Sequence, residues 1–132
     1  MATIRKEMRV AAPPAEVWDA FADVGAIHTR IAPGFVVDTV LEGEVRRVTF
    51  ASGFVAMESI VSVDTTRRRL AYAITGSALM THHNATFEIF PDAGGTRVVW
   101  QADLLPDTAA SQVGGMMEEG LAAMGRVFGT AP

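Results

Sequence analysis

The sequence contains no cysteine, and its 132 residues include only one tyrosine, two tryptophans and three histidines. The absence of cysteine excludes a disulfide framework, a thiolate zinc site and a cysteine nucleophile. No apolar run approaches the roughly 18 residues that a membrane-spanning helix needs. Residues 1–10 also lack the apolar core of a signal peptide, so we expect no integral membrane segment and a cytoplasmic location.

Charged side chains are scarce as well, at 20% of the residues, and eleven basic against fifteen acidic groups give a net charge of −4. This balance argues against nucleic-acid binding, which depends on basic surfaces. Apolar residues make up 49% of the chain, a high share for a soluble domain. We therefore expect one domain over residues 1–132 whose apolar surplus is buried, bound to a small molecule or shared with a second subunit in a homodimer.

Turn residues divide most of the chain into short segments with strand periodicity. Residues Thr3–Val10 predict a first strand, and the proline-initiated segment Pro14–Asp23 and the segment Gly25–Ile31 predict two short helices. Six further strands are predicted between turn signals: Val36–Leu41, Val45–Phe50, Phe54–Val63, Arg69–Thr75, His83–Phe90 and Thr96–Leu105. From Asp107 onward apolar residues recur at helical spacing, which predicts a long C-terminal helix.

Six strands in hairpin succession, together with the first strand, predict one curved antiparallel sheet of seven strands. The last helix is the only predicted element long enough to cover the concave face of that sheet. The expected fold is therefore α+β, with a seven-stranded curved antiparallel sheet wrapped around a long C-terminal helix and two short helices after the first strand. Such a sheet encloses space between itself and the helix.

Four segments carry a resemblance to a known superfamily: Ala12–Phe21 (APPAEVWDAF), Glu58–Asp64 (ESIVSVD), Arg69–Tyr72 (RLAY) and Gly94–Trp100 (GGTRVVW). In order and spacing they resemble the START-like, or helix-grip (SRPBCC), superfamily, which includes birch-pollen-allergen-like proteins and polyketide cyclase/dehydrase domains. The resemblance covers essentially the whole chain and implies a ligand cavity between the concave sheet and the last helix. It does not specify a reaction, because this fold hosts lipid transfer, hormone sensing, cyclisation and co-chaperone functions.

The resemblance also implies which side chains line the cavity. The polar candidates are Glu58, Tyr72, His83 and Gln101, among which Glu58 and His83 are the candidate acid/base groups. The apolar candidates are Ala56, Ile60, Phe87, Val99, Met116, Gly120 and Met124. Residues at these positions would orient a small molecule through a few polar groups in an otherwise apolar space.

The inner face of the last hairpin stays open at this point. If the loop Pro91–Gly95 places Phe90 opposite Thr96, then Phe87 and Val99 share the cavity face with His83, Ala85, Gln101 and Asp103. The alternate phase groups Val98, Trp100, Ala102 and Leu104, which are more apolar. A bulge at the glycine pair would exchange the two faces.

The titratable candidates also carry two interpretations. Glu58 lies in mid-strand and faces either solvent or the cavity, where desolvation would raise its pKa. His82 and His83 are adjacent on a strand, so only one of them can enter the cavity. No third ligand lies at a recognised spacing from this pair, and we expect no metal and no cofactor.

Three functions are compatible with these patterns. The first is binding or transport of a small hydrophobic molecule such as a lipid, a polyketide or an aromatic compound. The second is a cofactor-free cyclase/dehydratase in which Glu58 or His83 assists enolisation and loss of water. The third is a protein-interaction role, like that of the co-chaperone branch, through an outer sheet face on which Trp100 would lie exposed.

Overall fold

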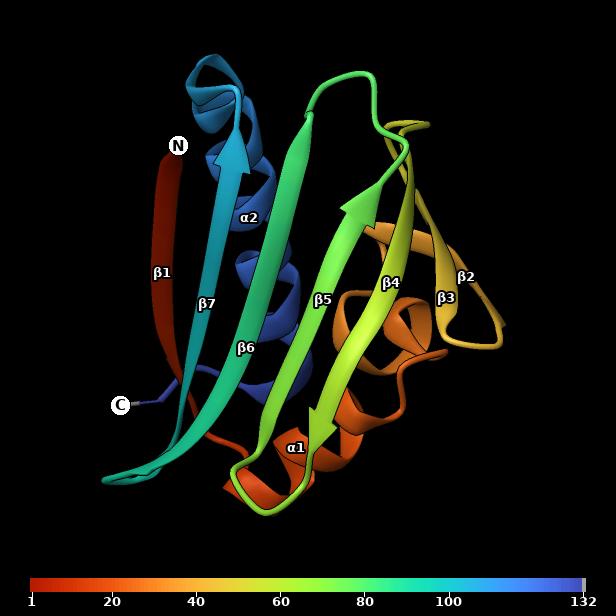
Figure 1. The fold of residues 1–132 in the computed structure, drawn as a ribbon. Helices are drawn as coiled ribbons and strands as arrows, with labels where there is room; N and C mark the ends of the chain where they lie inside the picture. Colours follow the sequence, from red (N-terminus) through yellow and green to blue (C-terminus); the bar gives the residue numbers. More distant parts are fainter. Residues whose placement is uncertain (132) are drawn as a thin grey trace.

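The chain folds into one antiparallel sheet that curves around its last helix in the computed structural model, which describes residues 1–131 (Figure 1). The strands are β1 (Ala2–Val10), β2 (Val36–Glu42), β3 (Val45–Phe50), β4 (Val55–Asp64), β5 (Arg69–Thr75), β6 (His82–Asp92) and β7 (Gly95–Leu105). Their order in the sheet is β1-β7-β6-β5-β4-β3-β2. The sheet is therefore a meander from β2 to β7, and β1 pairs with the last strand.

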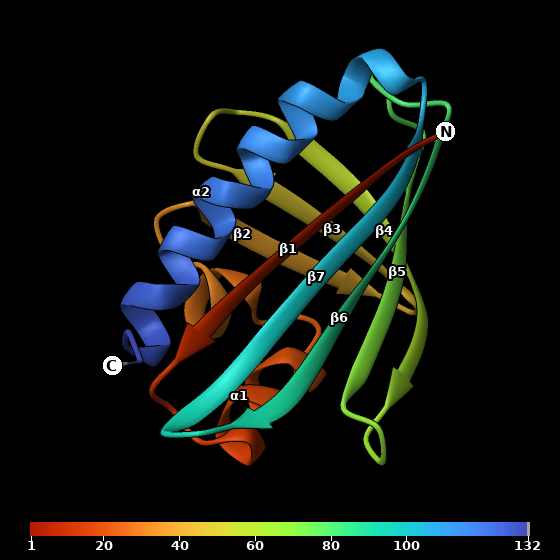
Figure 2. The same cartoon turned by 90° about the vertical axis from the view of Figure 1, so that its left-hand side faces the viewer.

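Two helices and two short helical turns lie on the concave side of the sheet. They are α1 (Pro14–Ala22), the π-helical turn η1 (Ile27–Ile31), the 3-10 turn η2 (Asp107–Ala109) and α2 (Ala110–Phe128). Pro14 begins α1. Proline has no backbone N–H, and at the first position of a helix that group would have no hydrogen-bond partner within the helix in any case. Figure 2 shows α2 along the concave side of the sheet and α1 at one end of it.

The predicted fold class is confirmed, and the ends of the predicted strands differ from the observed ends by at most two residues. The segment Gly25–Ile31, predicted as a short helix, contains a single π-helical turn, η1, from Ile27 to Ile31. The predicted C-terminal helix begins one turn later than expected, because residues Asp107–Ala109 form a 3-10 turn before α2.

The register of the last hairpin shows that the first of the two predicted pairings, with Phe87 opposite Val99, is wrong. Asp92 pairs with Gly95, so the hairpin closes through the two-residue loop Ala93–Gly94 instead of a five-residue loop. Phe87 consequently pairs with Trp100 and not with Val99. Since a shift of one residue exchanges the two faces of a strand, Trp100 joins the concave face.

Gly95 fixes this hairpin against the end of β1. A Cβ added at Gly95 would lie 2.0 Å from the backbone oxygen of Val10, a separation that no side chain tolerates. Gly94 has a φ of 79°, which suits a tight hairpin turn, but a Cβ added there would meet nothing within 4 Å. The two glycines therefore serve different purposes, close approach at Gly95 and backbone conformation at Gly94.

We predict that Gly95→Ala lowers the free energy of unfolding by at least about 2 kcal/mol, because the backbone of β1 must move to accommodate the methyl group. The matched control is Gly94→Asn, which keeps a residue that tolerates positive φ and should cost less than about 1 kcal/mol. Urea denaturation followed by circular dichroism measures both. Equal losses in the two variants would contradict the assignment of the close contact to Gly95.

Candidate functional site: two adjoining cavities beneath the last helix

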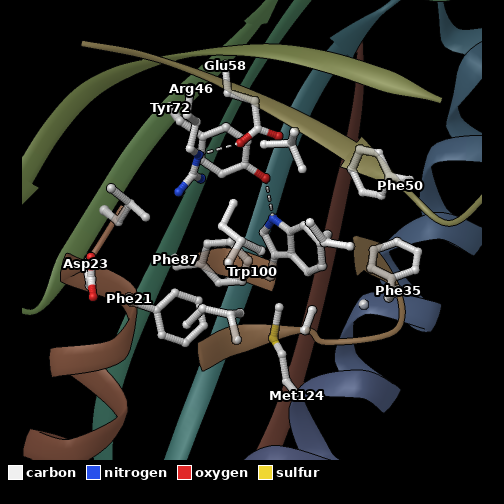
Figure 3. A pocket seen from close by; sticks show the side chains of 17 residues that line it. Phe21, Asp23, Phe35, Arg46, Phe50, Glu58, Tyr72, Phe87, Trp100 and Met124 are labelled. Carbon is white, nitrogen blue, oxygen red and sulfur yellow. Dashed lines mark hydrogen bonds and ion pairs between the residues drawn. The ribbon is translucent and has the colours of Figure 1, made fainter. Parts of the chain in front are cut away.

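Two adjoining cavities lie between the concave face of the sheet and the helices, each with a volume of about 50 Å³. The first cavity reaches toward α1 and η1, and Figure 3 shows the 17 side chains that line it. The second cavity reaches toward the β5–β6 loop and the N-terminal half of α2, where Leu79, Met80 and Met116 line it. Aromatic and aliphatic side chains dominate both linings, as in typical small-molecule sites.

Most of the predicted site residues reach these cavities. Glu58 and Tyr72 line both of them. Phe87, Gly120 and Met124 line the first cavity, and His83 and Met116 line the second. Ala56 and Ile60 are inner-face residues of β4 that pack in the core without lining either cavity.

Val99 and Gln101 are corrections to the predicted site. The observed register places both on the outer face of β7, opposite to Phe87 and Trp100, and neither lines a cavity. Trp100, which the interaction hypothesis placed on the outer face, lines both cavities instead. The cause is the short hairpin loop, because it sets the alternation along the whole of β7.

Sequence reasoning missed Arg46, which lines the first cavity from β3. Arg46 pairs directly with Glu58 across the β3–β4 hairpin. The turn signal at residues 51–53 contained this information, because a hairpin centred on residue 52 places positions 46 and 58 opposite each other. Phe35 and Phe50 were also missed; both line the two cavities from the open end of the β2–β3 hairpin, where Phe50 pairs with Val36.

Arg46 and Glu58 form a buried ion pair, with 3% and 5% of their surfaces exposed. The Nε of Arg46 donates to Oε1 of Glu58 at 2.7 Å, and its Nη1 donates to the backbone oxygen of Val24 at 3.2 Å. The guanidinium also lies over the Tyr72 ring, 5.2 Å from its centroid. Burial raises the pKa of the Glu58 carboxyl above its usual range, and the charge of Arg46 offsets part of that rise.

Tyr72 accepts a hydrogen bond on its hydroxyl oxygen from Nε1 of Trp100 at 3.0 Å (Figure 3). Burial raises the pKa of Tyr72 well above its usual value, and the negative charge of Glu58 raises it further. The hydroxyl therefore keeps its proton at neutral pH. No hydrogen bond among residues 1–131 uses that proton, so it is available to a bound molecule.

His83 lies at the second cavity with one ring nitrogen already occupied. Its Nδ1 accepts a hydrogen bond from the backbone N–H of Ile74 at 3.1 Å. Burial, together with the neighbouring His82, lowers the pKa of His83 to about 4, so the ring is neutral at pH 7. The proton of the neutral ring is then on Nε2. His83 can therefore donate to a ligand, but it has no free lone pair with which to act as a base.

Residues 1–131 contain no group of three histidine, aspartate or glutamate side chains arranged to hold a metal ion. Over the same residues, no helix has the length and apolar composition needed to cross a bilayer.

Solved structures with the helix-grip fold match the chain over nearly its full length. The XoxI protein of Bacillus cereus has a TM-score of 0.86 and 19% identity, covering 97% of this chain and 96% of that one. A Thermobifida fusca protein solved by NMR has a TM-score of 0.76 and 28% identity, covering 100% and 99%. A point mutant of norcoclaurine synthase from Thalictrum flavum, in complex with a transition-state analogue, has a TM-score of 0.68 and 17% identity, covering 96% and 93%.

The predicted membership of the START-like, helix-grip superfamily is thus confirmed. A sequence profile described as polyketide cyclase/dehydrase and lipid transport matches residues 1–129, and the chain belongs to this family. No curated protein matches it in sequence.

We predict that Arg46→Met lowers the free energy of unfolding by about 3 to 5 kcal/mol, because it leaves the Glu58 carboxylate buried without a counter-charge. The double variant Arg46→Met/Glu58→Leu should regain most of this loss. Arg47→Met, next in sequence but exposed, is the control and should change stability by less than about 0.5 kcal/mol. Chemical denaturation measures all three, and similar losses at positions 46 and 47 would refute a role for the buried pair.

We predict that His83 makes folding stability fall as the pH falls from about 6.5 to about 4. The unfolded chain takes up a proton on this histidine below pH 6.5, whereas the folded chain resists it until pH 4. The stability present above pH 6.5 should thus decrease by roughly 2 to 3 kcal/mol across this window.

His83→Gln should lack most of that decrease, because glutamine does not titrate. His82→Gln, on the exposed neighbour, should keep it. Urea titrations at a series of pH values measure the effect, and a His83→Gln curve parallel to that of the native protein would disprove the assignment.

Proposed function

We propose that this protein binds a small, mostly apolar molecule between the concave sheet and α2. The observation that carries the proposal is the convergence of Glu58, Tyr72 and His83 on a space whose other lining residues, apart from Arg46 and Asp23, are aromatic or aliphatic or glycine. Burying an ion pair is costly for a core that only has to be stable. Buried polar groups beside a cavity are instead typical of sites that orient a ligand.

The polar groups favour a ligand with an oxygen acceptor at one end. Tyr72 has an unused hydroxyl proton, and His83 has an Nε2 proton at the second cavity. A ketone or hydroxyl oxygen could accept from both, while the apolar remainder of the molecule contacts the phenylalanine and methionine side chains. Cavities of about 50 Å³ are much smaller than the ~300 Å³ or more of usual ligand sites, so the ligand is small or the cavity enlarges on binding.

A cofactor-free cyclase/dehydratase is the second candidate, favoured because Glu58 and His83 line the same cavity. In such a reaction Glu58 would take a proton from the carbon next to a ketone. Tyr72 and His83 would donate hydrogen bonds to the enolate oxygen. The description of the family includes both cyclases and lipid transport. Glu58→Gln combined with Arg46→Met, so that no unpaired charge stays buried, separates the two functions, because it would abolish turnover of a poly-ketone but keep binding of an apolar ligand through Tyr72 and His83.

The protein-interaction hypothesis loses its main support, because it required an exposed Trp100 on the outer face. Homodimer formation and a cytoplasmic location remain predictions.

We predict that binding quenches or shifts the fluorescence of Trp100 more than that of Trp18. Trp100 lines both cavities, and Trp18 is buried in the core and lines neither. Titration with 2-acetylnaphthalene should therefore change the emission of Trp18→Phe, which keeps Trp100, more strongly than that of Trp100→Phe.

The matched ligand 2-ethylnaphthalene lacks the carbonyl oxygen and should bind about tenfold more weakly, equivalent to about 1.4 kcal/mol. At about 100 times its dissociation constant, the ketone should also stabilise the fold by roughly 2.7 kcal/mol in thermal denaturation. An absence of binding by either compound, and by a panel of fatty acids and polyketides, would rule out the proposed function.

A further inference from the structure

Five side chains separate the two cavities and belong to the lining of both: Phe35, Phe50, Glu58, Tyr72 and Trp100. Trp100 is central among them. It starts on β7 in the floor of the site, and its ring reaches α2 on the opposite side (Figure 3). The two cavities are therefore halves of one space that a side-chain wall divides.

The Trp100 ring is held at three places. Its Nε1 donates to the Tyr72 hydroxyl at 3.0 Å, and its face stacks on Phe87 with centroids 4.5 Å apart. Its far edge fits against α2 at Gly120, where an added Cβ would lie 3.0 Å and 3.3 Å from two ring carbons. The missing side chain at Gly120 creates the recess that receives the indole edge.

Phe35 and Phe50 complete the wall on the other side of the recess. The same added Cβ at Gly120 would lie 3.3 Å from the Phe35 ring. Phe35 in turn contacts Phe50 edge to face, with centroids 5.1 Å apart. On this side the wall thus consists of aromatic rings, two of which, Trp100 and Phe35, meet at Gly120.

Within residues 1–131 no ionic contact holds the indole of Trp100, and its one hydrogen bond joins two neutral groups. Trp100 is also only partly buried, whereas Tyr72, Phe87 and Gly120 around it are buried. A ligand that stacks on Phe87 and donates a hydrogen bond to the Tyr72 hydroxyl would replace what these two residues lose when the indole moves.

We infer that Trp100 is a movable partition that determines the size of the ligand. A short ligand occupies one cavity while the indole stays against Gly120. A longer ligand occupies both cavities after the indole leaves the recess and releases the Tyr72 hydroxyl. This inference rests on the proposed function, and it identifies Trp100 as the specificity-determining residue of the site.

The first test compares a short and a long probe with the same polar group, 2-naphthol and 1-hydroxypyrene. Trp100→Leu should increase the affinity for 1-hydroxypyrene relative to 2-naphthol on the order of tenfold over the native protein. Trp18→Leu is the matched control, because it makes the same substitution in the core outside both cavities, and its ratio should equal that of the native protein. An unchanged ratio in Trp100→Leu would overturn the inference.

The second test follows the indole N–H resonance of Trp100 by NMR, assigned by its absence in Trp100→Phe. In the native protein, saturation with 1-hydroxypyrene should move this resonance to the position of an indole N–H that has lost its hydrogen bond to Tyr72, whereas 2-naphthol should cause a smaller shift because that hydrogen bond stays. Binding of 1-hydroxypyrene with the resonance unchanged would show that the indole does not move, which overturns the inference.

A third test needs no organic ligand and so distinguishes failure of the inference from failure of the proposed function. Native crystals under xenon pressure should contain two separate xenon sites, one on each side of the indole, and Trp100→Leu should contain one continuous site. If no probe binds but the xenon sites are separate and then merge, the partition stands and the proposed function fails. A single continuous site in the native protein would overturn the partition.

Discussion

A buried guanidinium needs a counter-charge and hydrogen-bond acceptors, and at Arg46 these requirements join four parts of the chain. The counter-charge comes from Glu58 on β4, an acceptor from Val24 before η1, and an aromatic face from Tyr72 on β5. The curved sheet and the segment that leads into β2 are thereby held in one arrangement around the cavities. Loss of one partner would leave the other charge buried without a counter-charge, so the two residues stabilise the fold only together.

The same polar cluster limits the chemistry that the site can perform. Tyr72 and His83 both act as hydrogen-bond donors toward the cavity at neutral pH. His83 cannot act as a base there, because its Nδ1 lone pair already accepts a hydrogen bond from the backbone N–H of Ile74. Within this cluster, Glu58 is the side chain that can accept a proton, since the other carboxylate at the first cavity, Asp23, is paired with Arg30. Binding and catalysis therefore share the same donors and differ in the role of one carboxylate.

The sequence predicted the fold almost completely, because its signals were local. Turn residues set the strand ends, and the apolar spacing after Asp107 set the long helix. The inward face of β7 was harder to predict, since an even or an odd number of loop residues decides whether Trp100 or Val99 faces inward. The position of the β3–β4 turn was enough to pair Arg46 with Glu58. Arg46 was nevertheless overlooked, because it stands next to Arg47 and two adjacent arginines are typical of a charged surface. The contact between Trp100 and Gly120 joins two elements through space, and no local pattern encodes it.

A single substitution at Gly120 would change the shape of the site. A glycine codon becomes an alanine codon through a single nucleotide change, and that one methyl group would fill the recess in α2. The substitution also favours the helix, because alanine is the better helix former by about 1 kcal/mol. A single mutation would thus improve the helix and at the same time press on the rings of Trp100 and Phe35, so helix propensity and the shape of the cavities make opposite demands on this one position.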